Sequence, residues 1–341
     1  MAVVGSIHSD LILVNDSEGD PALYVDYPDR DNALLFDAGD VAGLGTSKLA
    51  DLDAVFLTHH HADHVSDLDR VIRANLNSDK TIELFGPEGT IERVYDRVRS
   101  YAHSYFPFQR LVLNVHDVRD DRIDTAALEY SKRFPPPERT VSDYSPGQTL
   151  FENESVRVTS APTDHTVAGL AYALVEKPSY AIRQEKLAQS DLKRGPWIAR
   201  LIERLEANES AAPVRRFEIE GGTFDVKTLA DRFLRRSRGQ KIVYLVDTIY
   251  QSGTPRGEGL CRLAKSADRL FGDCFYRDAQ SKAAAKHRHL TTSDLARLAT
   301  DAGVKSVTPI HFSQRYLGRG DQTVEELRGH LRGSNVRLIP A

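Results

Sequence analysis

A cluster of histidines and one aspartate directly follows a short apolar run, and this cluster limits what the chain can fold into more than any other feature. The run Ala54–Thr58 has the β-branched and aromatic composition of a buried strand, and it leads into His59-His-His61-Ala-Asp63-His64. A His-x-His-x-Asp-His string arises by chance in about one of a thousand such chains. Imidazole and carboxylate groups are ligands that suit zinc, and a tight strand-to-helix turn lets alternate side chains face different ions. Without metal, the imidazoles would repel one another or leave buried nitrogens unpaired, so the string predicts a metal site.

Short apolar runs alternate with helix-like segments along the chain. This alternation predicts an α/β protein in which helices cover buried sheets. The expected strands are 22–26, 33–37, 54–58, 82–85, 156–159, 171–175, 242–246 and 304–307.

Two helices are expected near the end of the chain. Apolar residues recur at helical spacing from Leu295 to Ala302, after the cap candidates Thr292 and Ser293, and Gly303 can close this helix in a left-handed conformation. Val324, Leu327 and Leu331 mark a final amphipathic helix by the same spacing.

We expect residues 1–341 to form one continuous domain with an arm-like excursion at about 180–217. The excursion is polar and basic, and it carries Gly195-Pro196 and the lone Trp197. Residues 183–241 hold 14 Lys or Arg against 9 Asp or Glu, in a chain whose formal net charge is −4. A basic segment on an acidic protein is suited to RNA phosphates. The alternative is an ordinary solvated helix face.

The two cysteines and the hydropathy pattern indicate a cytoplasmic protein. Two cysteines exclude both a disulfide framework and a four-thiolate zinc site, and they fit a reducing compartment. The first ten residues lack a basic region before their apolar residues, and no stretch approaches 18 consecutive apolar residues. We therefore expect neither secretion nor a membrane span.

The histidine string resembles the signature of the metallo-β-lactamase fold, an αβ/βα sandwich of two mixed β-sheets flanked by helices. The resemblance implies two divalent metal ions, zinc first and manganese as an alternative. It assigns His59, His61 and His165 to one ion, and Asp63, His64 and His311 to the other, with Asp247 bridging them. Two such ions can lower the pKa of a shared water and stabilise both the attacking and the leaving oxygen of an in-line displacement.

Other parts of the same resemblance concern residues around the predicted ligands. Asp37-Ala-Gly39 matches the family's Asp-x-Gly turn, which implies that the carboxylate orients a ligand histidine; an ordinary turn is the alternative. His60 lies between two ligands and is expected to point away from the metals. His103, His116 and His330 have no motif around them.

Within this superfamily, two segments look like ribonuclease Z, the endonuclease that removes 3′ trailers from precursor tRNA. His311-Phe-Ser-Gln-Arg315-Tyr resembles its His-Phe-Ser-x-Arg-Tyr ending, and His289-Leu-Thr takes the position of its His-Ser-Thr motif. By this resemblance His289 is the general acid, Asp273 holds it, and Asp63 accepts a proton from the nucleophilic water. Arg315 is expected to contact phosphate, with a surface salt bridge as an equal alternative.

The function implied is endonucleolytic removal of 3′ trailers by a two-zinc phosphodiesterase, with precursor tRNA as partner, the excursion as its tRNA-gripping arm and a homodimer as its assembly. One alternative is a phosphodiesterase for cyclic nucleotides or other small nucleotide-like diesters. A thioesterase of the glyoxalase II type and an RNA-binding protein with a vestigial site rank lower. The thioesterase would have no use for His289, and loss of function would be expected to remove at least one of the seven ligand candidates.

Overall fold

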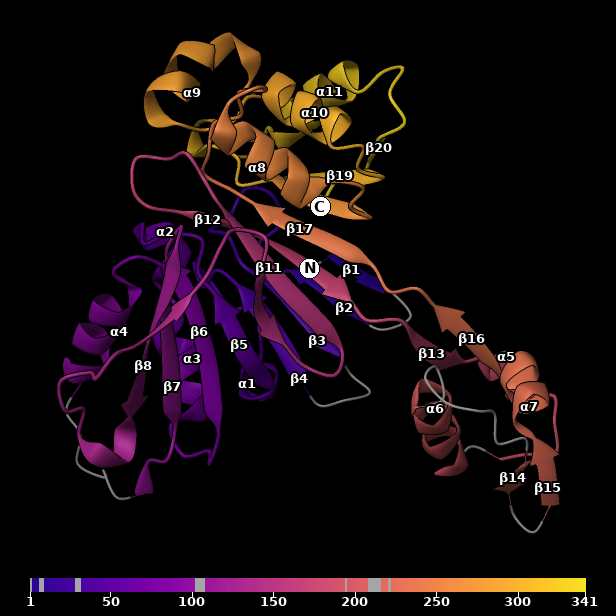
Figure 1. Cartoon of the computed structure of the whole chain (residues 1–341). Coiled ribbons are helices and arrows are strands. Elements are labelled where there is room, and N and C mark those ends of the chain that lie inside the picture. The colour runs from indigo at the N-terminus through magenta and orange to yellow at the C-terminus, as the bar shows by residue number, and fades with distance from the viewer. Residues whose placement is uncertain are drawn as a thin grey trace. The chain divides into compact units, whose positions relative to one another are not determined.

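The computed structural model describes residues 2–5, 9–27, 32–101, 108–193, 195–207, 216–219 and 222–341. The chain divides into two compact units, which we describe separately (Figure 1). The larger unit comprises Met1–Val175 and Lys241–Ala341, and the smaller one comprises Glu176–Gln240.

The larger unit contains a mixed sheet whose strands follow one another in chain order, from β1 to β9 among the described residues. Neighbours are antiparallel from β1 to β4, parallel from β4 to β7, and antiparallel again to β9. The strands are β1 (Ala2–Gly5), β2 (Asp10–Leu13), β3 (Leu23–Tyr27), β4 (Asn32–Phe36), β5 (Leu52–Phe56), β6 (Thr81–Pro87), β7 (Val112–Val118), β8 (Arg122–Glu129) and β9 (Thr140–Asp143).

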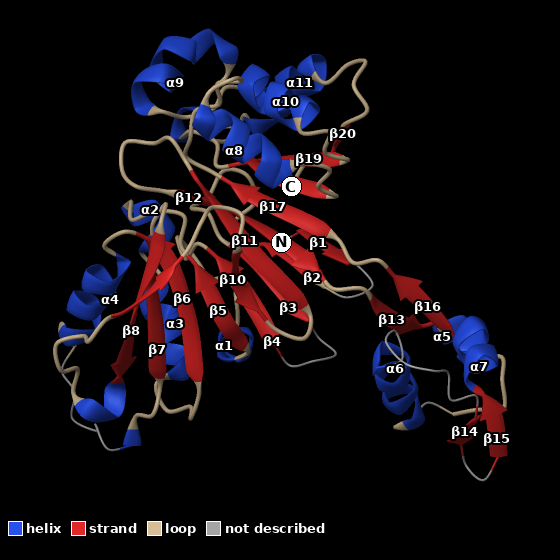
Figure 2. Ribbon diagram, in the orientation of Figure 1, coloured by secondary structure: helices blue, strands red, loops and turns tan. Residues whose placement is uncertain are grey.

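A second sheet has the order β10-β11-β12-β17-β18-β19-β20, and its last four strands are parallel. These strands are β10 (Thr149–Glu152), β11 (Val156–Pro162), β12 (Leu170–Glu176), β17 (Lys241–Leu245), β18 (Arg269–Asp273), β19 (Ser306–Ile310) and β20 (Arg337–Leu338). Figure 2 shows both sheets in red, with helices on their outer sides.

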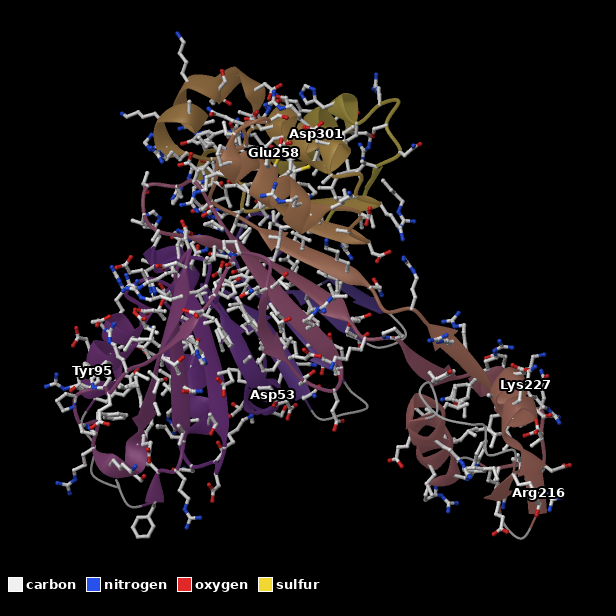
Figure 3. The ribbon with its side chains drawn as sticks, viewed as in Figure 1. Asp53, Tyr95, Arg216, Lys227, Glu258 and Asp301 are labelled. Atoms are coloured by element: carbon white, nitrogen blue, oxygen red, sulfur yellow. The ribbon has the colours of Figure 1, made fainter. Side chains whose placement is uncertain are left out.

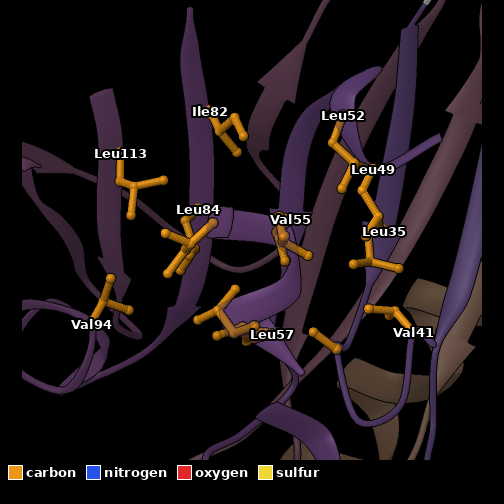
Figure 4. Close-up of a cluster of buried hydrophobic side chains, with 14 of the residues drawn as sticks. Leu35, Val41, Leu49, Leu52, Val55, Leu57, Ile82, Leu84, Val94 and Leu113 are labelled. Carbon is orange, nitrogen blue, oxygen red and sulfur yellow. The ribbon is translucent and has the colours of Figure 1, made fainter. Parts of the chain in front are cut away.

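Helices cover the outer face of each sheet, while aromatic residues fill the space between the sheets. The helices are α1 (Thr46–Ala50), α2 (Ala62–Val65), α3 (Leu68–Asn75), α4 (Thr90–Arg99), α8 (Pro255–Ala264), α9 (Ser281–His287), α10 (Thr292–Asp301) and α11 (Gly320–His330), and the 3₁₀ turns are Tyr130–Lys132, Asp278–Gln280 and Gln314–Tyr316. Figure 4 shows one helix-facing cluster, in which Leu35, Val55 and Leu84 of the first sheet lie near Leu49 and Val94 of the helices. Phe36 and Phe56 of the first sheet pack against Tyr172 and Tyr244 of the second. This helix–sheet–sheet–helix layering confirms the predicted fold class.

The predicted strands all exist, and their ends differ from the expected ones by no more than three residues. The expected helix over Leu295–Ala302 is α10, and Gly303 does close it with φ +61°. The expected cap is wrong by one residue: the N-cap is Thr291, whose side chain accepts from the Asp294 amide while Asp294 accepts from the Thr291 amide. None of the helices in the described ranges is long and apolar enough to cross a bilayer.

The smaller unit has its own apolar cluster. It consists of β13 (Ser179–Ile182), α5 (Gln184–Ala188), α6 (Trp197–Ala207), β14 (Arg216–Ile219), β15 (Gly222–Asp225), α7 (Val226–Phe233) and β16 (Leu234–Ser237). Trp197 and Leu201 of α6 pack in one cluster with Phe217, Leu229 and Phe233. The unit carries 14 Lys or Arg against 10 Asp or Glu; Arg216 and Lys227, which Figure 3 labels, are two of its basic residues. The expected excursion at 180–217 lies within this unit, which continues to Gln240.

Candidate metal centre

The carboxyl ends of five strands meet at one edge of the larger unit and carry the predicted site residues. Each strand ends just before one of them: β4 before Asp37, β5 before the histidine string, β17 before Asp247 and β19 before His311, while β18 ends on Asp273. Parallel strands place their carboxyl ends at a common edge, where the chain leaves the sheet and side chains are free to converge.

The first predicted ligand group is assembled around one oxygen of Asp247. The structure brings together ligand atoms of His59, His61, His165 and Asp247, all within 4.8 Å of one another. Asp247 Oδ2 lies 3.2 Å from His59 Nε2 and 3.5 Å from His165 Nε2. The Nδ1 of His165 donates to the Arg288 carbonyl at 3.0 Å, which fixes the ring and leaves Nε2 facing the group.

The second group shares the same aspartate. Ligand atoms of Asp63, His64 and His311 lie within 4.8 Å of one another. Asp63 Oδ2 is 3.3 Å from His311 Nε2 and 3.6 Å from His64 Nε2. Asp247 reaches this group as well, because its Oδ1 is 2.7 Å from His311 Nδ1 and its Oδ2 is 3.6 Å from His64 Nε2. Asp247 therefore lies between the two groups, as a bridging ligand would.

Unsatisfied buried polar atoms indicate that these two groups are arranged to bind a ligand. Among the described residues, His59 Nε2, His64 Nε2, Asp247 Oδ1 and His311 Nδ1 are buried and have no hydrogen-bond partner of acceptable geometry, although they lie close together. Leaving a buried polar atom unsatisfied costs about 1–3 kcal/mol, so four at one place are improbable in a site that stays empty. A convergent set of imidazole nitrogens and carboxylate oxygens fits two divalent ions of the zinc class.

Three residues of this edge adopt a left-handed backbone within two residues of the ends of their strands. Asp37, Asp247 and His311 have φ values of +57°, +52° and +60°, and none of them is glycine. Such a conformation costs of order 1 kcal/mol for each residue and persists only where the surroundings enforce it. The strain at three strand ends is concentrated at this one cluster of side chains.

The Asp37 carboxylate is buried behind the second group and positions His64. Its Oδ2 is 2.8 Å from His64 Nδ1, and Thr58 donates to it through both its amide and its hydroxyl. The Tyr244 hydroxyl donates to it at 3.2 Å; burial and the Asp37 charge keep the pKa of this phenol well above its usual value. Asp37 thus orients a histidine of the cluster, as the turn motif implied.

His289 lies beside both groups and is held by Asp273. Its Nδ1 is 3.2 Å from Asp273 Oδ2 and 3.6 Å from Asp247 Oδ1, and its ring stacks on Phe275 with centroids 4.0 Å apart. Burial lowers the pKa of His289, but the charge and hydrogen bond of Asp273 outweigh it, so the pKa is raised overall. The shorter Asp273 side chain therefore reaches the histidine that the resemblance assigned to it.

The remaining sequence candidates lie away from the two ligand groups. His60 turns toward α4, where its Nε2 is 2.7 Å from the Thr90 hydroxyl, and His116 and His330 pair with Glu83 and Asp278. His103 lies outside the described residues. Arg315 is exposed and lies over the Tyr276 ring at 5.2 Å. It has no carboxylate partner in the described part of the chain, so the salt-bridge alternative is not observed.

Two residues of the site have no signal in the sequence. Phe275 supports the His289 ring from a position with no motif of its own. Asp20 comes from the loop between β2 and β3, and its Cβ lies next to Gly39, beside the Asp63 backbone. Burial and then the Asp63 carboxylate raise its pKa. Only the path of the loops brings these residues to the cluster.

Comparison with known proteins agrees with this geometry. Residues 35–131 match the Beta-lactamase superfamily domain. The chain is 27% identical over 313 residues to a protein named ribonuclease Z from Deinococcus radiodurans, covering 85% of this chain and 88% of that protein.

Two solved structures share the fold. The metallo-β-lactamase fold protein YhfI from Bacillus subtilis is 16% identical with a TM-score of 0.55, and the match covers 97% of this chain and 95% of that one. The short form of human tRNase Z is 18% identical with a TM-score of 0.51, and the match covers 98% and 95% of the two chains. The chain therefore has the metallo-β-lactamase fold, contains a β-lactamase superfamily domain and is similar to ribonuclease Z over most of its length.

Proposed function

We propose that this protein is a two-zinc phosphodiesterase that removes 3′ trailers from precursor tRNA. The observation that carries the proposal is the His289–Asp273 pair, which lies against the two ligand groups where a leaving oxygen needs a proton. Metal binding alone does not require this pair. The broad similarity to a protein named ribonuclease Z supports the same reaction.

In this proposal His59, His61 and His165 hold one ion, Asp63, His64 and His311 hold the other, and Asp247 bridges them. The ions would make water nucleophilic at neutral pH and offset charge that develops on the phosphoryl oxygens. Zinc suits the five imidazoles and two carboxylates, and manganese is the alternative because it also accepts carboxylate and imidazole ligands.

The protein's own side chains would move the protons. The Asp63 side chain is 42% exposed, so its carboxylate can reach a water and accept a proton from it. The bond from the water oxygen to phosphorus forms as the bond from phosphorus to the ribose 3′-oxygen breaks. His289 uses Nδ1 for Asp273, so Nε2 is the atom that would protonate this 3′-oxygen. The trailer would keep a 5′-phosphate and the tRNA a 3′-hydroxyl.

The smaller unit favours an RNA substrate over a small diester. It carries a net charge of +4 in a chain whose net charge is −4. Contacts between basic side chains and RNA phosphates give affinity without sequence readout. A cyclic nucleotide or another small diester would use the same metal groups without the smaller unit. A thioester would not need His289, because a thiolate leaves without prior protonation.

One experiment tests the function directly. Purified protein is analysed for metal and assayed side by side on a trailer-bearing precursor tRNA and a chromogenic phosphodiester. We expect two zinc ions per chain and a higher kcat/KM on the precursor. Asp247→Ala should lose metal and reduce both activities by at least about 100-fold, because it removes the shared ligand. Hydrolysis of small diesters without precursor cleavage would contradict the proposal, and full activity with fewer than two ions would contradict the metal assignment.

The resemblance also predicts a homodimer, and the cysteine content predicts a cytoplasmic location. Sedimentation at micromolar concentration would test the first, and fractionation of the source cells the second.

A further inference from the structure

We propose that a cavity on the α4 side of the metal centre binds a backbone phosphate of the RNA trailer, with Arg93 as its main anion ligand. The cavity has a volume of about 210 Å³ and is lined by His60, Val65, Leu68, Arg93, Val94 and Arg97. This inference rests on the proposed function, because it assigns a position to one part of the proposed substrate.

The cavity adjoins the metal centre through His60, which lies between the ligand candidates His59 and His61 in the chain. The Thr90 hydroxyl lies 2.6 Å from the Pro87 carbonyl and donates to it, so it accepts from His60 Nε2 at 2.7 Å. This hydrogen bond fixes His60 as one wall of the cavity, which Arg93 and Arg97 also line.

Arg93 is the cation of this cavity that is available to a ligand. It is exposed, and no carboxylate in the described ranges pairs with it; its NH1 donates only to the Gly89 carbonyl at 2.8 Å. Its acidic neighbours along the chain are engaged elsewhere, Glu88 by Arg119 and Glu92 by Arg139. An exposed guanidinium without a carboxylate partner at a cavity mouth is suited to a phosphate, which it can bind with two parallel hydrogen bonds.

Arg97 has a different role on the next turn of α4. It donates to the Val65 carbonyl at 2.9 Å and to Asp69 at 3.2 Å, so it ties α4 to the segment that follows the histidine string. The first amides of α4 are also occupied, because Asp117 accepts from the Gly89 and Ile91 amides. Anion binding in the cavity therefore depends on the Arg93 side chain rather than on the helix terminus.

The polarity of the RNA strand matches the position of the cavity. His289 would face the 3′-oxygen, which belongs to the tRNA, whereas the trailer continues from the 5′-oxygen of the same phosphorus. The two histidines point to different places: His289 packs on His165 and His311, whereas His60 contacts Thr90 of α4. In Figure 1, α4 and α9 lie on different sides of the larger unit. A trailer that leads away from His289 can thus reach α4.

The size of the cavity fits one group of a polymer. Sites for whole small molecules usually measure about 300–1,000 Å³. This cavity is smaller, and three of its six lining residues, Val65, Leu68 and Val94, are apolar. It can accept a phosphate with part of its ribose, while the rest of the strand stays in solvent.

The test compares Arg93→Ala with Arg99→Ala in the full-length, metal-loaded enzyme. Arg99 is a matched control on the same helix, because it is exposed and lies over Tyr95, outside the cavity (Figure 3 labels Tyr95). The two substrates are precursor tRNAs whose trailers are one and ten nucleotides long. For Arg93→Ala we expect KM on the long trailer to rise about three- to tenfold with kcat nearly unchanged, and the salt slope of binding to fall by about 1. The one-nucleotide trailer and the chromogenic diester should be unaffected.

A separate binding experiment distinguishes this inference from the proposed function. Anisotropy measures the affinity of a labelled decanucleotide with a 5′-phosphate, which corresponds to the released trailer. Weaker binding by Arg93→Ala but not by Arg99→Ala supports the cavity even if precursor tRNA proves not to be cleaved. Equal binding by both variants and the wild type, or equal KM changes on short and long trailers, overturns the inference.

Discussion

Asp37 Oδ2 and His64 Nδ1 form a fully buried pair at 2.8 Å, in which a strained residue at the end of β4 orients a histidine of the metal centre. The pair fixes which ring nitrogen of His64 is left for a ligand, because Nδ1 is engaged and Nε2 faces Asp63 and Asp247. A buried carboxylate behind a ligand histidine also raises its basicity, so in the proposed site Asp37 would contribute to metal affinity without touching the metal.

The first prediction concerns this pair. Asp37→Asn keeps the volume but removes the charge, and we expect the affinity for the ion near His64 to fall about 10–100-fold. Competition with a chromophoric chelator measures this affinity. Asp40→Asn serves as control, since the Asp40 carboxylate accepts from the nearby Ala42 amide and belongs to neither ligand group. Equal affinities of Asp37→Asn and wild type would show that the carboxylate has no part in metal binding.

Much of the centre was predictable from the sequence because its residues directly follow recognisable strands. His165, Asp247 and His311 each follow an apolar run, and the two-sheet fold brings such ends together. The N-cap of α10 was missed among three adjacent hydroxyl residues, although the spacing from Thr291 to Asp294 is that of a capping box and could have identified it. Asp20 and Phe275 could not be predicted, because loop geometry alone positions them.

The smaller unit, Glu176–Gln240, extends further along the chain than the expected excursion at 180–217, for a physical reason. Val226–Phe233 and Leu234–Ser237 read as another helix and strand of the main alternation. Only packing shows that Leu229 and Phe233 belong to the cluster of Trp197 and Leu201. Local periodicity reports which face of a helix is apolar and does not report which core that face joins.

The second prediction concerns proton transfer by His289. His289→Ala should slow cleavage of precursor tRNA about 10²- to 10⁴-fold, because the ribose 3′-oxygen is a poor leaving group. An activated aryl phosphodiester should be slowed far less, since its leaving group needs little protonation. The control is His287→Ala, an exposed histidine two residues away. Similar losses on both substrates would point to a structural role for His289 and remove it as general acid.

The third prediction concerns the smaller unit and RNA affinity. Because its cluster joins α6 to α7, deleting only 183–216 would expose Leu229 and Phe233. Glu176 and Gln240 are hydrogen bonded through their backbones, so 177–239 can be replaced by an Asn-Gly turn. We expect tRNA binding to weaken and its salt slope to fall, with turnover of the chromogenic diester retained.

A second variant tests the same role in the full chain. Arg232→Glu combined with Arg235→Glu should also weaken tRNA binding. Unchanged tRNA affinity in both proteins would exclude an RNA-binding role for the smaller unit.

The fourth prediction follows from the neutral state of His60. Burial and the charges of Arg93, His59 and Arg97 lower its pKa to about 3 in the folded chain, against about 6.5 when unfolded. Between these values the unfolded chain binds a proton that the folded chain does not, so His60 makes the free energy of unfolding fall as the pH drops below 6.5. The limiting slope from one proton is about 1.4 kcal/mol per pH unit. His60→Gln keeps an N–H donor for Thr90 but cannot titrate, so its stability should fall less steeply. Urea unfolding of the chelator-treated wild type and variant at pH 7, 6 and 5 measures the difference, and parallel curves would mean that His60 is protonated in the folded chain.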